Sequence, residues 1–288
     1  MYNMKRILTL FCIILLISGK LGLLGALELE ISAGINNFTF QPEKTTAGDV
    51  FDPYQYILGN LSLRGDISKA WGFDFNLKTD NIFQYTADFR LKTRTDYFGF
   101  DFGLFTGMTD SFEIPDFGIL GSIEATLPGI MFLSVGGSST ICSKFDFTGN
   151  NYRESFEAKL GFWLPFAIPV FSVSSKSFTR FIPDDPDPIR DNLIRFQFSS
   201  DFFGKTSPLS LRVDAGYQIL SRIYDVDDTD ELSSWFAGLD FQYSISKALR
   251  LFVGAEMPFV VTATSPLTAS DEFWTMFKAY GGFIIRFF

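Results

Sequence analysis

The titratable side chains of this sequence are mainly acids, lysines and arginines, and histidine is absent. The 288 residues include 33 Asp and Glu and 24 Lys and Arg, which gives a formal net charge of −9. Without imidazole there is no serine–histidine–aspartate triad, no histidine general base and no histidine-ligated metal. An acidic chain without clustered Lys and Arg is also a poor partner for nucleic acid. We therefore expect no enzyme, no catalytic residue, no cofactor and no metal site.

Two acidic runs are the strongest candidates for a cation site. One is residues 184–188 (DDPDP) and the other is residues 225–231 (DVDDTDE). Clustered carboxylates can bind Ca²⁺, but neither run has the glycine that an EF-hand loop needs at its sixth position. We expect both runs to be solvated exterior loops.

The first 26 residues have the pattern of a secretory signal peptide. Lys5 and Arg6 form a basic start, residues 7–18 are continuously apolar, and the segment ends in small residues at Ala26. The alternative is an N-terminal membrane anchor, but the apolar run is shorter than the about 20 residues that a spanning helix needs. We expect cleavage after Ala26 and a single domain over residues 27–288.

Removal of this leader would leave Cys142 as the single cysteine, because Cys12 lies within the leader. No intramolecular disulfide can then form, although the exported location would permit one. Cleavage would also remove three positive charges, which brings the net charge of the mature chain to about −12.

After residue 27 the dominant period of the sequence is two. In residues 71–78 Trp, Phe and Leu alternate with Gly, Asp, Asn and Lys, and residues 83–92, 209–218 and 235–244 alternate in the same way. Side chains on a strand point to opposite faces in turn, so each segment has one apolar face and one polar or small face. A soluble β-sandwich gives the same alternation, so the length and number of the segments must discriminate.

The segments are longer than soluble strands, which are typically about 5–6 residues. Most reach the roughly 9–11 residues that a tilted strand needs to cross a bilayer. No later stretch is apolar enough for a membrane-spanning helix, and a closed barrel is the other structure that crosses lipid. We predict an all-β, transmembrane, antiparallel up-and-down β-barrel of about 14 strands, with 12 or 16 if segments were merged or split. The segments lie near 27–38, 54–66, 70–79, 82–92, 96–106, 117–127, 130–139, 153–163, 167–177, 191–201, 208–220, 233–245, 248–260 and 276–288.

The connections between segments support the barrel, because short turns and long loops alternate as they do when both chain ends lie on one side. Even-numbered segments are followed by turns such as residues 68–69 and 246–247. Odd-numbered segments are followed by longer stretches such as residues 39–53 and 221–232. Residues 80–81 alone break the rule.

The final residues of the chain carry a recognisable pattern. Spaced aromatic and apolar residues and a terminal Phe resemble the sorting signal of bacterial outer-membrane β-barrel proteins. That resemblance implies an outer-membrane location, with lipid and the barrel-assembly machinery as partners, and we expect a monomer. The phenylalanine-rich strands are also similar to spirochaete barrels. Arg286 departs from the pattern, since it shares a face with the terminal residue. The matching residues are Tyr280, Gly282, Ile285, Phe287 and Phe288.

The polar faces of the strands are expected to line a lumen. Their charges are nearly balanced in sign, whereas a strongly ion-selective pore would favour one sign. The alternative role for these charges is cross-strand ion pairing that stabilises the wall. About 14 strands enclose a bore between side-chain-filled small barrels and open porins of 16–18 strands. The charged lumen candidates are Arg64, Asp74, Lys78, Asp88, Arg90, Asp101, Glu124, Glu157, Lys159, Arg195, Arg212, Asp214, Asp240, Arg250, Glu256, Lys278 and Arg286.

These patterns favour a porin-like passive channel for small hydrophilic solutes. One alternative is a surface ligand-binding or adhesin barrel that acts through its long loops. The other is a transporter of hydrophobic molecules, suggested by the 36 Phe residues. The transporter is the weaker alternative, because no plug segment separates the expected cleavage site from the first strand.

Overall fold

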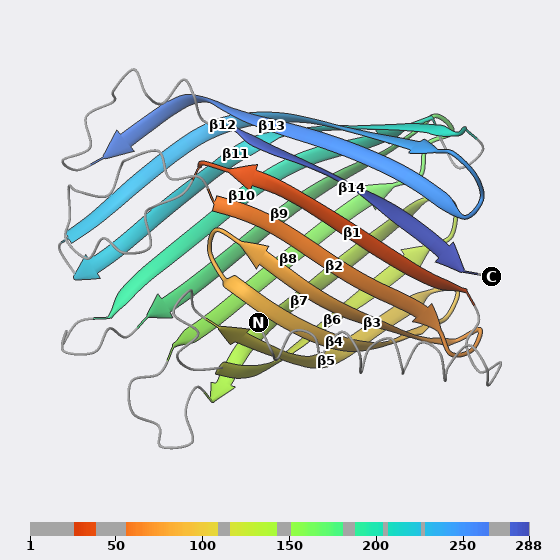
Figure 1. Ribbon diagram of the computed structural model, residues 1–288, viewed down its shortest axis with the longest axis horizontal. Coiled ribbons are helices and arrows are strands. Elements are labelled where there is room, and N and C mark those ends of the chain that lie inside the picture. Colours follow the sequence, from red (N-terminus) through yellow and green to blue (C-terminus); the bar gives the residue numbers. More distant parts are fainter. Residues whose placement is uncertain are drawn as a thin grey trace, which may run out of the picture.

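The fourteen strands of the described chain close into one antiparallel up-and-down barrel, so the predicted fold class is confirmed (Figure 1). A computed structural model describes residues 26–38, 56–108, 116–142, 151–180, 188–203, 207–225, 228–264 and 277–287. The expected signal peptide, residues 1–26, and Phe288 lie outside these ranges, apart from Ala26. Among the described residues, no helix is long and apolar enough to span a membrane.

Each strand pairs with its neighbours in sequence, and β1 closes the ring against β14, with Leu27 opposite Phe287 and Asn36 opposite Lys278. The strands are β1 (Leu27–Asn36), β2 (Tyr56–Asp66), β3 (Trp71–Asp80), β4 (Gln84–Arg94), β5 (Phe98–Met108), β6 (Asp116–Leu127), β7 (Met131–Cys142), β8 (Tyr152–Phe162), β9 (Ala167–Arg180), β10 (Ile189–Phe202), β11 (Leu209–Asp225), β12 (Asp228–Ser244), β13 (Leu249–Thr264) and β14 (Lys278–Phe287).

The two ends of the barrel differ in their connections. The end at which β1 begins and β14 finishes is called the turn end here, because β2, β6 and β12 are followed there by short connections. The opposite end, called the loop end, holds the connections that follow odd-numbered strands. The tight connection after β3 is the exception that the sequence indicated, since only three residues separate β3 from β4.

The connection between β11 and β12 corrects one prediction. A long loop was expected over residues 221–232, but β11 runs to Asp225 and β12 begins at Asp228. Most of the acidic run 225–231 is therefore strand. Asp230 is fully buried and accepts a hydrogen bond from the Tyr224 hydroxyl at 3.0 Å. The Asp230 carboxyl group therefore has a buried hydrogen-bond partner, whereas in a solvated loop it would bond to water.

The barrel wall is apolar outside and polar inside, the reverse of a soluble protein. Phe102 on the outer face of β5 is 54% exposed, whereas Asp88 on the inner face of the neighbouring β4 is only 6% exposed. Phe98 and Phe100 share the outer face of β5 and are also exposed. An apolar outer band of this kind matches the lipid-facing surface of a membrane β-barrel.

Several inner-facing aromatic rings lie over glycines of the neighbouring strand. Phe105 lies over Gly118, and Phe236 lies over Gly216, each pair being opposite one another in the strand register. Rings that cover cross-strand glycines in this way stabilise the sheet at positions where glycine would otherwise weaken it. These ring–glycine contacts also hold the rings against the barrel wall, so the rings occupy less of the central bore.

Substituting Gly216→Ala is expected to destabilise the barrel by about 1–3 kcal/mol, because a methyl group there overpacks the wall. The added Cβ would meet both the Phe196 carbonyl oxygen and the Phe236 ring. Urea unfolding of the purified protein in detergent measures the change. Gly281→Ala is the matched control, since a Cβ there would find no atom nearer than 3.4 Å. Equal unfolding midpoints for the two variants would contradict the packing argument.

Candidate functional site

The β3–β4 connection folds into the mouth of the barrel at the loop end. Residues 80–83, called the tip from here on, place Ile82 and Phe83 among the buried side chains, at 2% and 9% exposure. The turn is stabilised internally, because Asp80 Oδ1 accepts hydrogen bonds from the backbone N–H groups of Ile82 and Phe83 at 2.9 and 2.6 Å. Asp commonly stabilises turns through such local bonds.

Polar contacts hold the tip against strands on another part of the ring. Arg153 of β8 donates a hydrogen bond from Nε to the Phe83 carbonyl oxygen at 3.1 Å. Lys176 of β9 donates to Asp80 Oδ2 at 2.8 Å. Because β5, β6 and β7 separate β4 from β8 in the ring, these contacts span the lumen.

Apolar side chains fill the mouth around the tip. Phe178 of β9 and Leu232 of β12 are completely buried there. Asn81 of the tip donates a hydrogen bond to the Phe38 carbonyl oxygen at 3.1 Å, which joins the end of β1 to the same region. The alternation of polar and apolar residues does not predict this cluster. The one local signal is that Leu220 and Leu232 are apolar residues on the inner faces of β11 and β12, where most residues are polar. The buried cluster comprises Phe38, Ile82, Phe83, Phe178, Ile189, Leu220, Tyr224 and Leu232.

Buried ion pairs stabilise the same end of the barrel. The Asp191 carboxylate accepts hydrogen bonds from Arg180 at 2.9 Å and from Arg222 at 2.5 and 2.8 Å. Arg153 pairs with Asp116, and both side chains are completely buried. In the low dielectric of a protein interior, each of these charges would be costly without its partner.

Beneath the tip, toward the turn end, lies a polar chamber of about 320 Å³. Phe83 of the tip, Phe105 of β5 and Leu120 of β6 supply its apolar surface. The remaining wall consists largely of charged and hydroxyl-bearing side chains of β3 to β9. The structure brings six of the predicted lumen residues together here: Lys78, Asp88, Arg90, Asp101, Glu157 and Lys159.

A second group of the predicted residues lies on the wall formed by β10 to β14. Arg195 of β10 contacts Glu256 of β13 through two hydrogen bonds of 3.0 and 2.5 Å. Because β11 and β12 separate these strands, the contact crosses the inner surface. Arg212 pairs with Asp214 at 3.1 Å. The same wall holds Asp240, which accepts a hydrogen bond from Tyr280, and Lys278. The Arg195–Glu256 pair joins two strands, as in the predicted alternative role, whereas Arg212 and Asp214 belong to one strand.

The other predicted charges lie nearer the turn end. Arg64 pairs with Glu28 and Glu30 at 3.4 and 3.3 Å, and Arg286 pairs with Glu28 at 2.7 Å. Neither glutamate was among the charges predicted to line the lumen. Asp74 pairs with Lys92, Glu124 accepts a hydrogen bond from Thr126 at 3.4 Å, and Arg250 donates to Ser244 at 3.3 Å. Whether any of these charges borders a permeation path stays a prediction.

The residues of the predicted assembly signal divide between the two faces of β14. Phe287 is 47% exposed, and Ile285 shares its outer face. Tyr280 faces inward, where its hydroxyl donates a hydrogen bond to Asp240 at 2.9 Å. Gly282 lies opposite Phe252 in the register with β13. Recognition of these residues by an assembly machinery stays a prediction.

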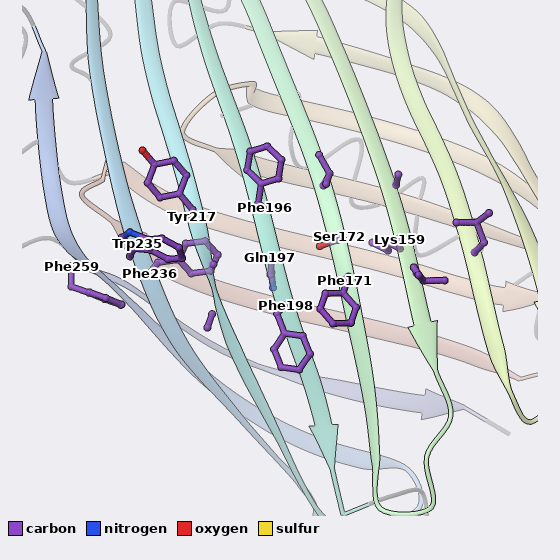
Figure 2. A pocket seen from close by; sticks show the side chains of 16 residues that line it. Lys159, Phe171, Ser172, Phe196, Gln197, Phe198, Tyr217, Trp235, Phe236 and Phe259 are labelled. Carbon is purple, nitrogen blue, oxygen red and sulfur yellow. The ribbon is translucent and has the colours of Figure 1, made fainter.

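A separate apolar hollow of about 670 Å³ lies on the outer wall over the strands from β7 to β13. Figure 2 shows the rings of Phe171, Phe196, Phe198 and Tyr217 on one face of the strands, with Gln197 behind them. Phe171 and Phe198 have ring centroids 5.1 Å apart, and those of Tyr217 and Trp235 are 5.3 Å apart. These outward-facing rings belong to the lipid-facing surface, so the hollow is separate from the chamber.

Within the part of the chain that the structure describes, no group of three acidic or cysteine side chains is placed to hold a metal ion. Residues 184–187 of the first acidic run lie outside that part.

No protein-family model matches this sequence, and no curated protein matches it. Solved structures do share the fold. An outer membrane channel from Pseudomonas putida F1 superposes with a TM-score of 0.50 at 8% identity, over 92% of this chain and 95% of that chain. An anion-selective porin from Comamonas acidovorans matches over 92% of this chain and 100% of that chain, with a TM-score of 0.41 and 10% identity. A loop-deletion mutant of OmpT, an outer membrane protein of Vibrio cholerae, covers the same shares, with a TM-score of 0.43 and 8% identity. At these identities the likeness is one of fold.

Proposed function

We propose that this bacterial outer-membrane β-barrel is a narrow passive channel for small hydrophilic solutes, closed at its loop end by the β3–β4 tip. The polar chamber directly beneath the tip is the observation that carries the proposal. The barrel acts as a monomer in this proposal, and its conduction requires no catalytic group.

The lumen has the properties of a hydrated path. A second cavity of about 360 Å³ lies between β14 and β3 and shares Lys78 and Asp80 with the chamber. Polar cavities of this size hold water, since water satisfies polar groups that the protein leaves unpaired. Fourteen strands also enclose more space than the small barrels whose interiors are filled by side chains. Displacing the tip would connect this space to the loop end.

Planar bilayers containing the purified mature protein test the proposal, with discrete conductance steps as the expected result. A double variant, Asp80→Cys with Lys176→Cys in a Cys142→Ser background, allows the tip to be cross-linked to β9. A short, reducible thiol cross-linker should silence this variant, and reduction should restore the steps. The two single-cysteine variants treated with the same reagent are the controls.

Two results would contradict the proposal. A barrel that migrates as folded on a heat-modifiability gel but never conducts would overturn the channel. Conductance that continues after complete cross-linking would overturn the role of the tip.

A transporter of hydrophobic molecules is the second candidate, and the buried apolar cluster inside the mouth is the observation that favours it. A hydrophobic solute entering from the loop end could contact this cluster, which includes Phe178, Leu220 and Leu232. The polar chamber beneath them does not suit such a route. An apolar solute there would displace water from the charged groups without replacing its hydrogen bonds, which costs free energy. Accelerated transfer of a fatty acid into vesicles without ion conductance would favour this candidate over the channel.

A further inference from the structure

We infer that the chamber beneath the tip is a binding site for small, uncharged, polyhydroxylated solutes the size of a single sugar ring. This inference rests on the proposed channel and names its class of solute. A volume of about 320 Å³ is at the lower end of the range for ligand pockets, which suits a ligand of one ring.

The charged side chains of the chamber already have partners. Four cations and four anions line it, so the chamber carries no net charge. A charged solute would lose its hydration here without finding an unpaired counter-charge, and it would have to compete with existing pairs. The pairs are Lys78–Asp88 at 3.7 Å, Arg90–Asp88 at 2.9 Å, Arg90–Asp101 at 3.8 Å, Lys159–Glu157 at 2.7 Å and Lys176–Asp80 at 2.8 Å.

Hydroxyl groups give the chamber the capacity to bind an uncharged polar solute. Four serines of β6 to β8 line one wall, and each hydroxyl can both donate and accept a hydrogen bond. Ser138 and Ser155 share a hydrogen bond of 2.7 Å between neighbouring strands. Solute hydroxyls can replace or extend such bonds without leaving a buried charge alone. The serines are Ser122, Ser134, Ser138 and Ser155.

Aromatic rings supply the apolar part of the site. Phe105 is held over Gly118, and both its ring and that of Phe83 line the chamber. The face of an aromatic ring carries partial negative charge, so it attracts the C–H groups on the apolar side of a sugar ring. Hydroxyl groups beside aromatic faces therefore match a solute with polar edges and apolar faces. Because Phe83 belongs to the tip, a bound solute would contact the tip itself.

Calorimetric titration of the full-length mature protein in detergent tests the site with three probes. We expect saturable binding of D-glucose with one site per chain. Glycine, a zwitterion, and inorganic phosphate, an anion, should bind at least about tenfold more weakly, the ratio that corresponds to about 1.4 kcal/mol. Phosphate or glycine binding more tightly than glucose would overturn the assignment of an uncharged solute.

Phe105→Ala is expected to weaken glucose binding by about tenfold, through loss of the ring contact. Phe132→Ala is the matched control, because Phe132 also lies over a cross-strand glycine, Gly161, but does not line the chamber. Ser134→Ala provides a second variant if Phe105→Ala fails to fold, with a smaller loss of affinity expected. Equal glucose affinity in Phe105→Ala, Ser134→Ala and the control would overturn the site.

The titration needs no conducting channel, so it separates the two proposals. Glucose binding by a barrel that never conducts would overturn the channel and leave the site in place. Conductance without saturable glucose binding would overturn the site and leave the channel in place.

Discussion

Removing two side chains that hold the tip, in the double variant Phe83→Ala with Lys176→Ala, is expected to open the mouth of the barrel. Lys176 bonds to Asp80 at 2.8 Å, and Phe83 belongs to the buried apolar cluster. Truncating a buried Phe to Ala typically costs about 3–5 kcal/mol of stability. Part of that loss would destabilise the closed position of the tip relative to the open one. A loss of about 3 kcal/mol would move the ratio of closed to open barrels by roughly 100-fold.

Single-channel recording in planar bilayers measures this change as longer and more frequent open intervals than the unmodified protein gives. The control is Lys159→Ala with Phe132→Ala, which removes the same two residue types without touching the tip. Lys159 pairs with Glu157 on its own strand, and Phe132 packs against Trp163 with ring centroids 5.4 Å apart. Equal opening in both double variants would show that general loosening of the barrel, rather than the tip, controls conduction.

Asp191→Ala is expected to destabilise the barrel by about 3–5 kcal/mol. The substitution removes the carboxylate that Arg180 and Arg222 share, and these two residues are only 9% and 1% exposed. Two buried positive charges would then lie close together without the anion that compensates them. Urea unfolding in detergent, followed by the shift in mobility of the folded form on a gel, measures the loss.

Glu157→Ala is the matched control for this prediction, because it also removes one acid from an ion pair inside the barrel. Glu157 and Lys159 are 49% and 40% exposed, so the loss should be below about 1 kcal/mol. Replacing all three residues, with Asp191→Leu, Arg180→Met and Arg222→Met, should recover much of the stability, since apolar side chains often replace buried ion groups without loss. Comparable unfolding midpoints for Asp191→Ala and Glu157→Ala would contradict the role given to the cluster.

The sequence by itself determined the barrel, a strand number near 14 and the assignment of faces, whereas the structure fixed the number at fourteen. These properties follow from local patterns, since alternation in residues 71–78 and 209–218 decides which side chains lie on which side of a strand. A bilayer strengthens that signal, because charged side chains on the lipid-facing side of a strand destabilise a membrane barrel. The tight connection at residues 80–81 was also visible, but only as an exception to the alternation of turns and loops.

Only the tertiary structure decided what lies inside the ring. The contact of Arg153 with the Phe83 carbonyl oxygen joins residues 70 positions apart, and no local period records such a pair. The burial of Asp230 beside Tyr224 likewise depends on how far β11 and β12 extend beyond their predicted ends. Closure of the ring brings the inner faces of non-neighbouring strands within reach of one another. The pattern of a strand predicts which of its faces points inward, but it does not predict which residues that face contacts across the lumen.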